Sequence, residues 1–180
     1  ARAVGMGESV VALNQDASSV FYNPATIAQL DQTEIYFTQI QWPAEISYDF
    51  FSITKNIKGR HYFGLNGGIL HMEPMIETTE FFPDGTGNYF TYQDQFIGLT
   101  YGAKMTDRFS FGLTIKQVSE NLAGFEMSTF LFDMGTFYWT GYKSLRFCAS
   151  ISHFGSQTGP NGSFEKLILD QESGVEINEQ

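Results

Sequence analysis

The chain has 180 residues, of which 42% are hydrophobic, 16% aromatic and only 17% charged. This composition excludes an intrinsically disordered chain, which lacks the apolar surface needed to offset its ordering entropy. The formal net charge of -10 argues against a nucleic-acid partner, because phosphate binding requires clustered Lys and Arg. No apolar run is long enough for a membrane-spanning helix. This observation does not exclude a membrane β-barrel, since its strands show only half of their side chains to lipid and their average hydropathy stays near neutral.

Residues 1–31 differ from the rest of the chain. They are rich in small residues and contain potential helix caps at Asp16, Ser18 and Ser19. Further along, Asn23 precedes Pro24, which biases Asn23 away from the helical conformation. We expect a short helical or turn-like segment that breaks at this dipeptide.

From Thr33 onward the hydrophobic period changes to two, which is typical of β-strands. The clearest strand covers residues 109–116, where Phe or aliphatic residues alternate strictly with Ser, Gly, Thr and Lys. We expect seven strands, within residues 35–42, 46–54, 62–71, 97–103, 109–116, 130–139 and 145–152.

The polar positions of these strands are mostly Gly, Ser or Thr. A soluble sheet usually carries Lys, Glu and Arg on the face that meets water. Small polar residues suit the interior of a barrel. We therefore interpret the two faces as lipid-facing and lumen-facing, and the fold class as an all-β, antiparallel transmembrane β-barrel.

The expected connections alternate in length, with short ones at residues 55–60, 105–108 and 141–144 and long ones at 73–94 and 119–127. This alternation is typical of outer-membrane barrels, although the join at residues 42–45 is short where a longer one is expected. Basic residues lie beside the short turns and acidic residues toward the long loops. The basic set is Lys55, Lys58, Arg60, Lys104, Arg108, Lys143 and Arg146, and the acidic set is Glu73, Glu77, Glu80, Asp84, Asp94, Glu120 and Glu126.

We divide the chain into an N-terminal segment (1–31), a strand meander (32–155) and a polar, acidic tail in loop conformation (156–180). Seven strands cannot close an antiparallel barrel, which pairs its last strand with its first, and an open sheet in lipid would leave backbone groups unpaired. Either the sequence is a fragment, or the strand count differs by one, or the sheet is soluble. We expect a truncated chain.

Four separated segments resemble the PorV/PorQ family of outer-membrane proteins, relatives of the FadL fatty-acid channel. They are the opening ARAVGMGESVVAL with DASSVFYNPA (1–25), TDRFSFG (106–112), FDMGTFY (132–138) and SHFG (152–155). The resemblance covers roughly residues 1–155 in the right order. It implies a complete barrel of about fourteen strands, of which this chain would supply the first half, with the N-terminal segment folded into the lumen as a hatch.

The resemblance implies that Asp16, Asn23, Pro24 and Ala25 are hatch residues, although Thr26 stands where the family usually has Gly. It implies a non-enzymatic protein of the bacterial outer membrane that serves type IX protein secretion and needs no cofactor. Its partners would be membrane lipid, secretion-system proteins and exported cargo. One alternative is FadL-like transport of fatty acids or other hydrophobic molecules. Another is a soluble β-sheet binding module whose aromatic face packs on itself.

Three residues at polar positions are candidates to face the lumen: Lys116, Asp133 and Arg146. If Lys116 meets Asp133, the pair could anchor the hatch through a screened interaction worth about 1 kcal/mol. Gly67 and Gly68 interrupt one strand and predict a bulge or kink; in FadL relatives such a kink opens a lateral exit.

We expect no metal site from the three scattered histidines. The acidic residues of the 73–94 loop offer oxygen ligands for calcium, and a solvated external loop explains them more simply.

Overall fold

The computed structural model describes residues 5–7, 9–13, 16–156, 158–159, 166–169 and 176–179. Residues 16–30 contain two short 3-10 helices, η1 (Ala17–Phe21) and η2 (Pro24–Gln29). The strands are β1 (Glu34–Gln41), β2 (Ile46–Ile57), β3 (His61–Met72), β4 (Met75–Ile76), β5 (Tyr89–Phe90), β6 (Tyr92–Lys104), β7 (Phe109–Leu122), β8 (Phe125–Trp139), β9 (Arg146–Gly155), β10 (Lys166–Leu169) and β11 (Glu176–Glu179). No helix in the described part of the chain is long and apolar enough to cross a bilayer.

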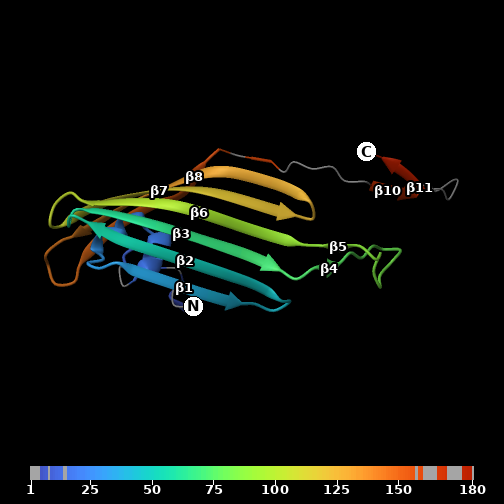
Figure 1. The fold of residues 1–180 in the computed structure, drawn as a ribbon, viewed down its shortest axis with the longest axis horizontal. Coiled ribbons are helices and arrows are strands. Elements are labelled where there is room, and N and C mark those ends of the chain that lie inside the picture. The colour runs from blue at the N-terminus through green and yellow to red at the C-terminus, as the bar shows by residue number, and fades with distance from the viewer. Residues whose placement is uncertain are drawn as a thin grey trace.

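The main sheet has seven strands in the order β1-β2-β3-β6-β7-β8-β9, and all neighbouring pairs are antiparallel (Figure 1). All seven strands predicted from the sequence are present, and so is the all-β class. Strands β1 and β9 form the edges, so the sheet is open over the part of the chain that the structure describes.

The predicted alternation of short and long connections is wrong at one place. Residues 119–127 were expected to be a loop, but β7 and β8 continue through them and pair up to Leu122 and Phe125. Only Ala123 and Gly124 remain as the turn, both with positive φ (51° and 89°), as tight hairpins require. The tail also differs from the loop that we expected, because β10 and β11 pair with each other within it.

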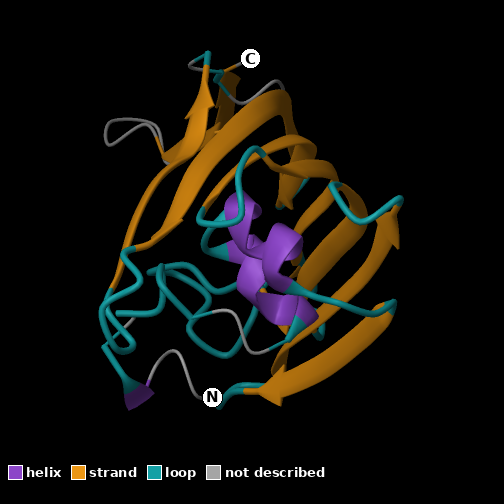
Figure 2. Ribbon diagram, turned by 90° about the vertical axis from the view of Figure 1, so that its left-hand side faces the viewer, coloured by secondary structure: helices purple, strands orange, loops and turns teal. Residues whose placement is uncertain are grey.

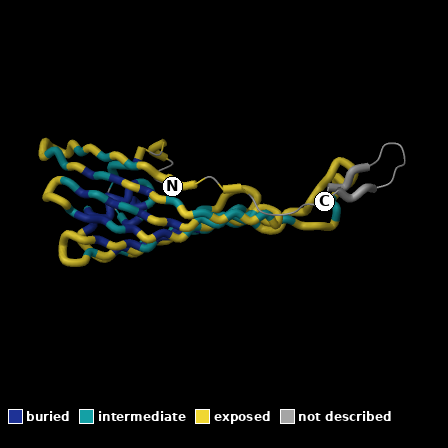
Figure 3. The backbone as a smooth tube through the Cα atoms, turned by 90° about the horizontal axis from the view of Figure 1, so that it is seen from above, coloured by how far each residue is buried: buried dark blue, intermediate teal, exposed yellow. Residues whose placement is uncertain are grey.

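The sheet is curved, and both helices lie in its hollow (Figure 2). We call this concave side the inner face and the convex side the outer face. Residues 16–30, which contain η1 and η2, form the inner segment. Buried residues gather at the end of the sheet where this segment lies (Figure 3). Val20, Ile27, Ala28 and Tyr62 form the apolar core between the segment and the sheet.

Four glycines of neighbouring strands make room for η2: Gly64 on β3, Gly102 on β6, Gly112 on β7 and Gly135 on β8. Gly102, Gly112 and Gly135 are direct cross-strand partners, and Gly64 lies two residues along β3 from Tyr62, the partner of Gly102. A Cβ atom at Gly112 would overlap the backbone of the inner segment at residues 24–25, and one at Gly102 would overlap the Ile27 side chain. These glycines therefore let two backbones approach closely. We call them the glycine row.

We predict that Gly112→Ala loosens the inner segment, because the new methyl group meets backbone atoms that cannot rotate away. Overpacking of this kind costs about 1–3 kcal/mol. Hydrogen exchange of the amides in residues 16–30 should become about tenfold faster or more. Gly64→Ala is the matched control, since its methyl group meets only the tip of the Ile27 side chain, at 2.8 Å. Exchange in Gly112→Ala no faster than in the unchanged protein would contradict this role of the glycine row.

Candidate functional site

Asn23 fixes the inner segment to the sheet and is fully buried. Its Nδ2 donates to the carbonyl oxygens of Val11 (3.0 Å) and Thr136 (3.1 Å), and its Oδ1 accepts from the Ala25 amide (3.0 Å). Asn23 is also the N-cap of η2, with Pro24 at the first helical position, where a missing N–H costs nothing. The Asn-Pro-Ala element is thus buried against β8 on the inner face.

Other polar contacts hold the two ends of the inner segment. Asp16 caps η1 by accepting from the Ser18 amide (2.9 Å). At the other end Gln29 joins two strands, because its Nε2 donates to Ser110 Oγ (2.8 Å) while its Oε1 accepts from Trp139 Nε1 (3.0 Å). Thr26 is buried and donates to the Asn23 carbonyl (2.7 Å). A side chain at this position is therefore accommodated.

Lys116 and Asp133 meet on the inner face, with 2.8 Å between Nζ and Oδ2. Their side chains are only 4% and 5% exposed, so this is a buried ion pair rather than the screened one that we expected. Asp133 Oδ1 also accepts from the His153 amide (2.7 Å), next to the irregular register between β8 and β9. The pair therefore connects β7, β8 and β9.

Arg146 also lies beside inner-face residues, since its guanidinium is 5.9 Å from the Phe137 ring centre and 5.3 Å from that of Trp139. The pairing of β3 with both neighbours runs through Gly67 and Gly68 without a register shift, so these glycines form no bulge here. The irregular register occurs instead between Phe132 and Met134 of β8.

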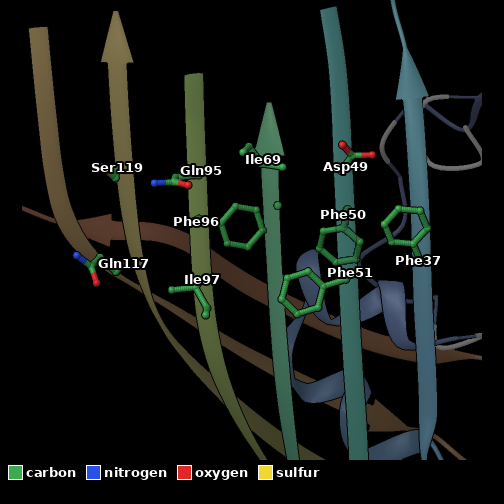
Figure 4. A pocket seen from close by; sticks show the side chains of 11 residues that line it. Phe37, Asp49, Phe50, Phe51, Ile69, Gln95, Phe96, Ile97, Gln117 and Ser119 are labelled. Carbon is green, nitrogen blue, oxygen red and sulfur yellow. The ribbon is translucent and has the colours of Figure 1, made fainter. Parts of the chain in front are cut away.

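An aromatic cluster lies on the inner face beside η1. The Phe21 ring contacts Phe50 edge to face (5.8 Å between ring centres) and lies 5.9 Å from Phe96, and Phe50 lies 6.2 Å from Tyr36. Close by, a pocket of about 540 Å³ lies over β3 at Gly68 and Ile69, and most of its lining residues belong to the outer face. Its lining is largely apolar and comes from five strands (Figure 4): Phe37, Asp49, Phe50, Phe51, Gly68, Ile69, Gln95, Phe96, Ile97, Gln117 and Ser119.

The outer face carries large apolar side chains that nothing in the described chain covers. Strand register places them in neighbouring rows across the seven strands. We call them the apolar band: Ile35, Phe37, Phe51, Ile53, Phe63, Ile97, Leu99, Ile115, Phe130, Phe132, Met134, Phe147 and Ile151. Leu99, near the middle, is 67% exposed.

The same outer face turns polar farther along the strands, toward the β3–β6 connection. Outward positions there are Gln39, Asp49, Gln93, Gln95, Gln117, Ser119 and Glu126. The inner face carries the buried rings of Phe50, Tyr62 and Phe137, but many of its other buried side chains are polar: Ser52, Thr54, Asn66, Thr100, Ser110, Thr114, Lys116 and Asp133. Thr100 links two of them, accepting from Asn66 Nδ2 (3.0 Å) and bonding Thr114 Oγ1 (2.7 Å).

Sequence reasoning missed the glycine row and the Gln29 contacts. Gly102, Gly112 and Gly135 occupy polar positions of their strands, but only the register brings them side by side. The structure brings no three His, Cys, Asp or Glu side chains together as a metal site among the residues that it describes. In the 73–94 loop, the Glu77 carboxylate instead accepts from Thr86 Oγ1 (2.9 Å) and Asn88 Nδ2 (3.1 Å).

Comparison of the chain with protein-family models and with curated proteins finds no match.

We predict that Lys116→Met lowers the free energy of unfolding by about 3–5 kcal/mol, because it leaves the Asp133 carboxylate buried without its cation. Lys116→Met combined with Asp133→Asn should regain much of this loss, since no buried charge remains. Gln117→Met on the outer face of the same strand is the control. Denaturant titration of the folded protein in detergent measures the free energy of unfolding of all three variants. A loss below about 1 kcal/mol for Lys116→Met would mean that the pair contributes no more than a solvent-screened surface ion pair.

Proposed function

We propose that the chain is part of a β-barrel protein of the bacterial outer membrane, of the PorV/PorQ type, with a non-enzymatic role in type IX protein secretion. The observation that carries the membrane assignment is the apolar band on an uncovered outer face. Soluble monomers rarely expose apolar patches of this extent. Lipid is the environment in which such a band is stable.

The inner face supports the same proposal. A barrel in lipid has a polar interior that is often filled by a plug, and here a polar inner face is covered by the chain's own inner segment. The open edges of β1 and β9 need further strands to satisfy their backbone groups in lipid. A complete barrel of about fourteen strands would provide them.

The secretion role draws support from the connection between β3 and β6. Its β4–β5 pair presents Phe81 and Phe82, which are 67% and 57% exposed. The loop is held by internal bonds, including mutual backbone bonds between Thr79 and Phe82. Exposed aromatic side chains on an ordered loop are suited to contact another protein.

Transport of hydrophobic molecules is the second candidate, and the pocket at Gly68 is the observation that favours it. Gly67 and Gly68 carry no side chains, and the Phe51 and Phe96 rings lie over them on opposite faces of the sheet. The sheet is therefore thin between the aromatic cluster inside and the apolar band outside. A hydrophobic molecule would find apolar contacts on both sides of this point.

We predict that Leu99→Arg destabilises the protein by about 2–4 kcal/mol, the cost of a cation on the lipid face of a barrel. Gln95→Arg adds the same charge to the outer face of the same strand, in the polar region, and should cost much less. Unfolding of full-length protein from lipid vesicles measures both. A soluble sheet would tolerate both substitutions, because both side chains would meet water.

We also predict that Phe81→Ala with Phe82→Ala reduces secretion of exported proteins severalfold, leaving them in the periplasm, while the barrel stays inserted. Met105→Ala is the control, since Met105 is 60% exposed in the β6–β7 turn at the opposite end of the sheet. Insertion is checked by the shift in gel mobility on heating. Normal secretion by the double variant, together with saturable binding of a fatty acid by the full-length protein, would favour transport instead.

A further inference from the structure

Positive charge gathers at one end of the sheet, where the β2–β3, β6–β7 and β8–β9 turns lie. The tip of the β2–β3 hairpin carries Lys55, Lys58 and Arg60, all exposed. The stretch from Phe50 to Met72 contains no acidic residue. The β6–β7 turn, in contrast, has Asp107 beside Arg108, and Lys104 lies 4.0 Å from Asp31. On the outer face the β2–β3 tip is therefore a local cationic site, while Glu34 of the neighbouring β1 lies opposite Thr54 on the inner face.

The tip is a fixed structure rather than a free loop. Lys58 and Gly59 form the turn with positive φ (57° and 70°). Asn56 Oδ1 accepts from the Gly59 amide (2.8 Å), and the Tyr62 hydroxyl donates to the Gly59 carbonyl (3.2 Å). These bonds fix the backbone of the turn that carries Lys58 and Arg60, so the backbone needs no further ordering to meet an anion.

The cationic tip adjoins the apolar band directly. Lys55 is the cross-strand partner of Phe63, and Phe63 is that of Tyr101, so the three lie in one row of the outer face. The Tyr101 hydroxyl bonds His61 Nδ1 (2.8 Å), and the two rings stack. Amphipathic rings of this kind occur where lipid tails give way to headgroups. The long Lys55 side chain can follow the apolar surface and place its ammonium at the same depth.

We propose that Lys55, Lys58 and Arg60, bordered by His61 and Tyr101, bind the phosphate headgroup of an anionic phospholipid in the leaflet beside the short turns. The inference rests on the proposed membrane location. The cations are opposite in charge to the phosphate headgroup, and the apolar band contacts the acyl chains of the lipid. The opposite end of the outer face offers mainly Gln and Ser with the acids Asp49 and Glu126, and so has no comparable group of cations for the same lipid.

Electron paramagnetic resonance of spin-labelled lipids tests the proposal on full-length protein in phosphatidylcholine vesicles. The association constant of spin-labelled phosphatidylglycerol relative to spin-labelled phosphatidylcholine should exceed one severalfold, and fall toward one at 1 M salt, where screening is strong. The variant Lys55→Gln, Lys58→Gln, Arg60→Gln should lose most of this preference.

The variant Gln39→Glu, Gln41→Glu, Gln93→Glu is the matched control, because it changes the net charge equally at the other end of the outer face. It should keep the preference. Loss in both variants would mean that only net charge matters, and retention in the first would place the lipid elsewhere; either overturns the proposal. Heat-dependent gel mobility is read on every sample. A protein that inserts but shows no preference refutes this site alone, whereas one that does not insert refutes the membrane location as well.

Discussion

The outer face of the sheet presents apolar side chains that nothing in the described chain covers, while buried polar side chains lie on the inner face. In water this arrangement is unfavourable, because the apolar surface stays hydrated while polar groups are desolvated. In lipid the same arrangement is favourable, provided that the polar groups find partners. This one constraint accounts for the position of the inner segment, the open edges of the sheet and the charge at the turns.

The inner segment supplies part of those partners, and its fit depends on close approach of backbones. Each strand from β3 to β8 that faces η2 has a glycine there, so the Asn-Pro-Ala element can lie almost on the sheet. Asn23 then donates to the carbonyl oxygens of Val11 and Thr136. The buried Lys116–Asp133 pair is also bonded to the backbone, since Asp133 accepts from the His153 amide at the irregular register of β8 and β9.

The sequence was sufficient to predict the strands, because alternation such as that of residues 109–116 reports directly on two unlike faces. It also predicted that Lys116 and Asp133 share the inner face, since both lie at polar positions. It could not predict the length of β7 and β8. Near the β7–β8 turn the outward side chains of these strands are polar, so residues 119–127 look like a loop. The glycine row and the Gln29 bonds to Ser110 and Trp139 depend on register across distant strands, which local patterns do not contain.

Under the proposed membrane location, the apolar band meets acyl chains, while the polar outward residues farther along the same strands do not. Spin labels placed singly at positions 93–103 of β6, with Cys148 replaced by Ser, test it in lipid vesicles. The account predicts that collisions with oxygen, which partitions into lipid, peak at 97 and 99. Collisions with a water-soluble nickel chelate should peak at 93 and 95. Equal access of the nickel chelate to 97 and 99 would contradict the account.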